Sequence, residues 1–215
     1  MSPAGRIGVW DLPVRLFHWA VVLLVPAMWW TAENEEMEIH ILLGQMMLGL
    51  VLFRILWGVL GSSTARFSGF VRGPGRMLAY LRGEKGGVGH NPIGALSVLA
   101  MLLALAVQVG LGLFASDEDG LHQGPLSYHV SAETAETLTE RHEMWFYVIL
   151  ALIALHLAAI LYYLMVRRDN LVAPMITGTR TAKVGETAMV PAPLWRLLLA
   201  AGLALGATLV IVRLL

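Results

Sequence analysis

The stretch RHEMWFYVILALIALHLAAILYYLMV, residues 141–166, decides the fold class of this chain. From Met144 to Val166 it is an apolar run that contains a single histidine, His156. A helix needs about 20 apolar residues to cross the hydrocarbon of a bilayer, and its backbone groups must be bonded internally there. We therefore predict a membrane-spanning helix over about 143–166.

Four further apolar stretches indicate the same kind of fold. They predict helices at about 16–31, 39–60, 93–115 and 194–212. The chain has 57% hydrophobic and 14% charged residues, whereas an ordinary soluble domain has about a quarter charged residues. No strand-like alternation of polar and apolar residues competes with these helices. The sequence therefore predicts an all-α, multi-pass transmembrane protein.

Charge and cysteine content exclude several classes of function. The formal net charge is +0, which gives no indication of a nucleic-acid partner. There are no cysteines, so disulfides, thiolate metal sites, iron–sulfur ligation and covalent haem attachment within the chain are excluded. The segment Met1–Pro13 lacks the pattern of a cleavable signal peptide, and we expect the first apolar run to anchor the chain.

The connections between the predicted helices alternate in charge. The first and third connections are acidic, with Glu33, Glu35, Glu36 and Glu38, and then Asp117, Glu118, Asp119, Glu133, Glu136 and Glu140 against one Arg141. The second connection and the segment after the fourth helix are basic, with Arg66, Arg72, Arg76, Arg82 and Lys85 against Glu84, and then Arg167, Arg168, Arg180 and Lys183. Basic connections face the cytoplasm. We expect a bacterial inner membrane protein with a cytoplasmic N-terminus and acidic loops in the periplasm.

Two histidines, His142 and His156, lie on one predicted helix. They are 14 residues apart, which at 1.5 Å per residue separates them by about 21 Å along the axis. Fourteen steps of about 100° also return the side chain to within about 40° of its starting direction. One face of this helix therefore presents a histidine near each membrane surface. An ionisable residue inside a membrane is costly and indicates a function.

Histidines at matching depths on other helices give each of these a partner. His18 lies near the cytoplasmic end of the first helix, at the depth of His156, and His40 begins the second helix, at the depth of His142. Two such pairs predict two non-covalent b-type haems with bis-histidine ligation. That ligation leaves no open iron position and suits electron transfer. Zinc is the alternative metal, but two histidines at each of two depths make a poor zinc site.

Two further residues are candidates for cofactor contacts. Arg54 lies 14 residues after His40 and would reach the depth of the cytoplasmic haem, where an arginine suits a propionate. The alternative is that its side chain extends to the membrane surface. His90, in the segment GHNPIG, is a candidate contact for a propionate or a quinone head group. We interpret His122 and His129 as solvated loop residues.

An ordered set of segments resembles the prokaryotic cytochrome b561 family, which includes the b-type cytochrome subunits of nickel–iron hydrogenases. The similarity spans about Val9 to Lys183. The segments are VWDLPVRLFHW (9–19), HILLGQ (40–45), FRILWGVLGSSTARFSGFVRGP (53–74), YLRG (80–83), GHNPIG (89–94), RHEMWFYVILALIALH (141–156) and NLVAPMITG (170–178).

The resemblance implies a four-helix bundle that holds two haems and exchanges electrons with a membrane quinone, ubiquinone or menaquinone, and with a redox partner. Carried onto this chain, its haem ligands are His18, His40, His142 and His156. The partner would be a c-type cytochrome outside the membrane, a hydrogenase or another oxidoreductase. We expect the dihaem domain over 1–185. The segment 186–215, a linker and a fifth helix, departs from the family's simplest pattern.

Three functions are compatible with these features. The leading hypothesis is a dihaem electron conduit between an external redox protein and membrane quinone, acting as an electron-transfer subunit rather than a stand-alone enzyme. The second is a superoxide:ubiquinone oxidoreductase, which would need a basic funnel where the outer loops are acidic. The third is a haem-free membrane scaffold or transporter, which would give a colourless protein.

Overall fold

A computed structural model describes residues 5–71, 73, 75, 78, 79, 82, 88–117, 120–182 and 185–213. Some residues used in the sequence predictions lie outside this described part. They are the charged residues Arg72, Arg76, Glu84, Lys85, Glu118, Asp119 and Lys183, together with Pro74, Tyr80, Leu81 and Gly83 of the family-like segments.

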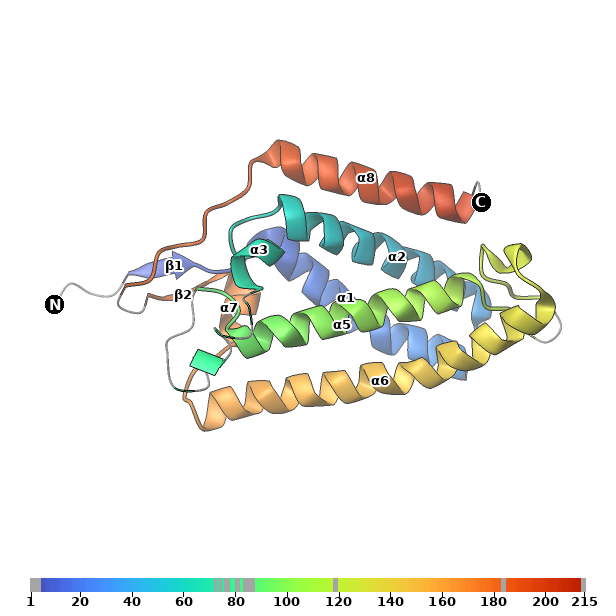
Figure 1. The fold of residues 1–215 in the computed structure, drawn as a ribbon, viewed down its shortest axis with the longest axis horizontal. Coiled ribbons are helices and arrows are strands. Elements are labelled where there is room, and N and C mark those ends of the chain that lie inside the picture. The colour runs from blue at the N-terminus through green and yellow to red at the C-terminus, as the bar shows by residue number, and fades with distance from the viewer. Residues whose placement is uncertain are drawn as a thin grey trace. The chain divides into compact units, whose positions relative to one another are not determined.

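Five helices in the described part of the chain are long and apolar enough to cross a membrane (Figure 1). They are α1 (Leu12–Glu33), α2 (Met37–Leu60), α5 (Pro92–Leu113), α6 (Ala132–Met165) and α8 (Leu194–Arg213). The all-α, multi-pass membrane fold is thereby confirmed. The strand β1 (Arg6–Gly8) precedes α1, and further short elements lie between the long helices: α3 (Phe67–Phe70), the 3-10 helix η1 (Ser127–His129), α7 (Val172–Thr177) and β2 (Thr179–Thr181).

Side-chain caps decide where several helices begin. Asp11 accepts a hydrogen bond from the backbone N–H three residues later at 2.8 Å, and Asn91 does the same at 2.7 Å. Ser131 caps α6 in the same way at 3.3 Å. Such caps satisfy N–H groups that have no partner within the helix. Helix α6 therefore begins at Ala132. The apolar run did not predict this start, because the first turns of the helix are polar.

The chain forms two compact units, and every long helix contributes residues to both. Unit 1 comprises Met1–Phe17, Arg54–Ala100 and Ala154–Ala200, and unit 2 comprises His18–Phe53, Met101–Ile153 and Ala201–Leu215. The functional candidates divide between them. His40 and His142 belong to unit 2, whereas Arg54 and His90 belong to unit 1.

In unit 1 the N-terminal segment is tied to the segment that follows α7. Strands β1 and β2 pair antiparallel, and the Val9 N–H donates to the carbonyl of Gly178 at 2.8 Å. The Thr64 hydroxyl donates to the Val9 carbonyl at 2.7 Å, and the Trp57 indole N–H donates to the Asp11 carboxylate at 2.9 Å. These bonds fix the entry into α1 against the end of α2.

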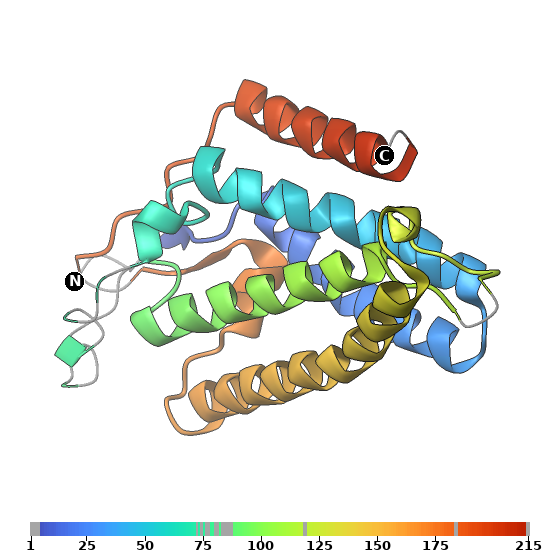
Figure 2. The ribbon, with the colours of Figure 1, turned by 45° about the vertical axis from the view of Figure 1, so that its right-hand side comes forward.

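In unit 2 the connection between α5 and α6 folds back on both helices (Figure 2). The Leu126 N–H donates to the Leu113 carbonyl at 2.8 Å, and the Ser116 N–H donates to the Thr139 hydroxyl at 3.0 Å. Helix α8 packs closely on α2 at Gly49. A Cβ added there would lie 3.3 Å from the Thr208 hydroxyl.

The division into a 1–185 domain and a 186–215 extension stays a prediction.

Candidate haem site

His40 on α2 and His142 on α6 face each other in unit 2. Their ring centroids are 6.1 Å apart, and the ring planes are inclined by 82°. Both histidines are half-buried. The structure therefore brings together one of the two histidine pairs that the sequence predicts.

Hydrogen bonds to backbone carbonyls hold both rings in one orientation. Nδ1 of His40 lies 2.9 Å from the Met28 carbonyl, and Nδ1 of His142 lies 2.9 Å from the Gln108 carbonyl. A carbonyl only accepts hydrogen bonds, so each Nδ1 carries the ring proton. Nε2 is then the unprotonated nitrogen in each ring, which is the form that binds a metal.

The spacing of the two rings fits an iron atom bound between them. A metal lies about 2 Å from a ligating imidazole nitrogen and the ring centre about 1 Å beyond it, so two opposed axial imidazoles have centres about 6 Å apart. The observed 6.1 Å agrees. No group of three metal-ligating side chains occurs in the described part of the chain. A metal with two protein ligands suits a porphyrin, which supplies the remaining four nitrogens.

Helix α5 carries no predicted ligand but positions His142. The Gln108 amide donates to the carbonyl of His142 at 3.0 Å and lies 3.2 Å from its Nε2. A metal-bound Nε2 accepts no hydrogen bond, so with iron bound the amide would keep only the carbonyl. A Cβ added at Gly112 would lie 2.9 Å from Cε1 of the His142 ring. Only glycine leaves room for this ring orientation.

Arg54 is a buried cation in unit 1, near the end of α2. It is 3% exposed, and its guanidinium carbon lies 5.3 Å from the centre of the Phe67 ring. Its Nη1 has no hydrogen-bond partner, and it makes no ion pair, among the described residues. The guanidinium is buried within the protein, and its contact with a propionate stays a prediction. A buried charge requires a counter-charge. The carboxylate of Asp11 acts on Arg54 from beyond ion-pair distance, and a carboxylate ligand would supply a closer one.

His90 lies in the same unit, between two aromatic rings. Its ring centroid is 4.5 Å from that of Trp10 and 4.8 Å from that of Phe70. Burial lowers the pKa of His90 to about 3, and the charges of Arg54 and His156 contribute in the same direction. His90 is therefore a neutral side chain, and its buried Nδ1 has no partner among the described residues.

The other predicted pair is divided between the units. His18 lies on α1 in unit 2, with its ring centroid 5.1 Å from that of Trp19, and His156 lies on α6 in unit 1. Their pairing stays a prediction from the sequence. His122, which we interpreted as a solvated loop residue, donates from its backbone to the Asp117 carboxylate at 2.9 Å, and its ring lies 3.1 Å from the same oxygen.

The chain matches the family model of prokaryotic cytochrome b561 over residues 9–178. It belongs to the prokaryotic cytochrome b561 family. This cytochrome is accordingly a multi-pass membrane protein that binds b-type haem and transfers electrons. Comparison with curated proteins and with solved structures gives no match.

Sequence reasoning did not predict the part that Gln108 plays in this cytochrome. A signal was present, because an amide inside an apolar helix is costly and usually bonds to a neighbouring helix. The parts of Met28 and Trp10 had no such signal. Met28 acts through its backbone carbonyl, which every residue has, and the contact of the Trp10 ring with His90 depends on the fold rather than on a sequence pattern.

Proposed function

We propose that this cytochrome is a dihaem conduit that carries electrons between membrane quinone and a redox partner beside the acidic loops. One observation carries the proposal: His40 and His142 face each other at 6.1 Å, with both Nδ1 protons directed to carbonyls. This arrangement leaves two unprotonated nitrogens for one iron. Haem b, when bound there, accepts and returns one electron at a time.

The protein's contribution at this pair is to fix the ligands and to limit rearrangement. The carbonyls of Met28 and Gln108 hold the ring protons, so that neither imidazole needs to change tautomer or turn. A site with two fixed ligands has no open position for oxygen, which supports electron transfer rather than oxygen chemistry.

The second haem of the proposal is held by His18 and His156. Its support is the matched depth of these residues in the sequence and the place of ligands on helices one, two and four that the family resemblance implies. Arg54 supports it further, because a buried arginine that forms no close ion pair with any described residue suits a haem propionate. We assign the neutral His90 to hydrogen bonding with a propionate or a quinone oxygen in the same region.

The charge pattern supports an orientation and a kind of partner. Basic connections predict a cytoplasmic N-terminus in a bacterial inner membrane. The acidic connections would then face the periplasm, where they suit the basic face of an external c-type cytochrome. Attraction between opposite charges raises association rates at low salt. We expect the rate of electron exchange with such a cytochrome to fall as ionic strength rises.

Single histidine substitutions test the haem assignment. We expect His142→Ala and His156→Ala each to remove half of the haem per protein, measured as the pyridine haemochrome of purified protein, and the double variant to remove all of it. His122→Ala, a histidine of the outer loop, is the matched control and should keep the full amount. Full haem content in the double variant would overturn the proposal, and equal losses in the control would show a general folding defect.

A further inference from the structure

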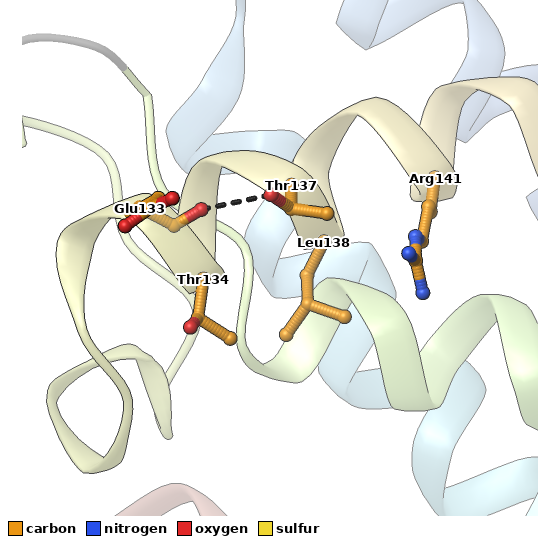
Figure 3. A pocket seen from close by; sticks show the side chains of 5 residues that line it. All are labelled: Glu133, Thr134, Thr137, Leu138 and Arg141. Carbon is orange, nitrogen blue, oxygen red and sulfur yellow. Dashed lines mark hydrogen bonds between the residues drawn. The ribbon is translucent and has the colours of Figure 1, made fainter.

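The first turns of α6 form one continuous face that changes from polar to apolar. With 3.6 residues per turn, Thr134, Leu138, Arg141 and Val148 share this face. Figure 3 shows the side chains of Thr134, Leu138 and Arg141 on the same side of the helix. Two hollows lie along it. The first is lined by Glu133, Thr134, Thr137, Leu138 and Arg141, and the second by Val107, Leu111, Arg141, Met144, Trp145 and Val148.

Arg141 lines both hollows, and the side chains on its two sides differ in polarity. The first hollow offers hydroxyls and the carboxylate of Glu133, whereas all other residues of the second are apolar. Arg141 is exposed and makes no ion pair or hydrogen bond with any described residue. It stands immediately before the apolar run of α6, which is the level of phosphate groups at a membrane surface.

The apolar hollow lies beside the haem site but is distinct from it. The Trp145 indole N–H donates to the Ala104 carbonyl at 3.0 Å and thereby links α6 to α5. Gln108 contacts His142, whereas the neighbouring positions Val107 and Leu111 line the hollow. Adjacent residues on a helix point about 100° apart. An occupant of the hollow therefore lies along a different stripe of α5 from the one that holds the haem ligand.

We propose that this face binds a zwitterionic phospholipid of the phosphatidylethanolamine type. The order of groups along such a lipid is acyl chain, phosphate, ammonium. The order along α6 is the apolar hollow, Arg141, and then Glu133, which lines the first hollow from the neighbouring side of the helix. The phosphate would accept bidentate hydrogen bonds from the guanidinium. An acyl chain would fill the apolar hollow, and the ammonium would pair with Glu133.

The surrounding charge selects a zwitterionic head group over an anionic one. Arg141 is the only basic residue of the first hollow, and the neighbouring Glu136, Glu140 and Glu143 are all exposed. A head group with a net negative charge would be repelled by these carboxylates. A zwitterionic head group neutralises both Arg141 and Glu133. A neutral quinone has no phosphate to accept hydrogen bonds from the Arg141 guanidinium.

Lipid retention by purified, haem-loaded protein tests this site. Delipidated protein is titrated with dioleoyl phosphatidylethanolamine or dioleoyl phosphatidylglycerol, and bound lipid is counted by native mass spectrometry. We expect Arg141→Gln to weaken phosphatidylethanolamine binding about tenfold or more, the loss typical of a charge-assisted hydrogen bond. Val148→Trp, which fills the apolar hollow, should weaken it without changing charge. Arg167→Gln removes an exposed arginine just after the C-terminal end of α6 and is the control.

A separate substitution tests the preference for the lipid head group. Glu133→Gln should remove the preference for phosphatidylethanolamine over phosphatidylglycerol while keeping total lipid binding. The proposal is overturned if Arg141→Gln binds as Arg167→Gln does, or if ubiquinone displaces the lipid. It is also overturned if wild-type protein prefers phosphatidylglycerol. Haem content, measured on the same samples, verifies that each variant is folded, and the result is independent of the number of haems.

Discussion

Replacing Gly112 by alanine should disturb the His40–His142 pair without altering either ligand. The added Cβ would lie 2.9 Å from Cε1 and 3.1 Å from Nδ1 of the His142 ring. Carbon atoms in contact are normally about 3.5 Å apart, so the ring must move by about 0.6 Å. Overpacking of this kind costs about 1–3 kcal/mol. Alanine returns about 1 kcal/mol of helix propensity relative to glycine, so the net change in stability is small.

The decisive measurement is therefore haem binding rather than thermal stability. A displaced ring lengthens the bond between its Nδ1 and the Gln108 carbonyl, and loss of such supporting bonds typically weakens metal affinity 10–100-fold. We expect Gly112→Ala to lose the haem held by His142 during dilution, seen as a lower pyridine haemochrome and a changed low-spin electron paramagnetic resonance signal. Gly110→Ala is the matched control, because nothing lies within 4 Å of its added Cβ. If both variants retain haem equally, the assigned contact is wrong.

Gln108→Leu removes the amide bonded to His142 and should shift the midpoint potential of one haem only, measured by redox titration. Arg54→Leu should lower haem retention more than Arg54→Lys, which keeps the charge, whereas a purely structural arginine would give similar losses of thermal stability and no haem effect. Partial burial raises the pKa of Asp117, but hydrogen bonds from His122 outweigh this and hold it below its usual 3.8. This loop is therefore stabilised above about pH 4, and its amide hydrogen-exchange protection factors, corrected for the intrinsic rate at each pH, should fall as pH falls through the lower folded pKa.

The sequence was sufficient to predict the helices and one histidine pair for a physical reason. In a membrane the apolar length of a helix is fixed by the bilayer, so the distance of a residue from the end of its run gives its depth. The depths of the two residues predicted that His40 and His142 lie opposite each other. Depth could not predict where α6 begins, because the turns before Met144 are polar and depend on the Ser131 cap rather than on lipid.

Contacts that depend on shape were beyond sequence reasoning. Gly110 and Gly112 are equivalent in sequence, since plain helix packing explains either. Only the structure distinguishes them, because one meets the His142 ring and the other meets open space. The burial of Arg54 was equally undetermined. Its position permitted a side chain directed to the surface or to a cofactor, and the choice depends on the packing around Phe67.

The contacts of α5 explain how a helix without ligands sets the properties of the haem site. Ala104, Gln108 and Gly112 are spaced by four residues and therefore form one ridge of the helix. Through this ridge α5 accepts the Trp145 indole, bonds twice to His142 and leaves room for its ring. Because all three contacts act on α6 within unit 2, substitutions on the ridge should affect the haem of His142 and leave any haem held by His156 unchanged. A ridge variant that altered both haems equally would indicate that α5 supports the whole bundle rather than this one ligand.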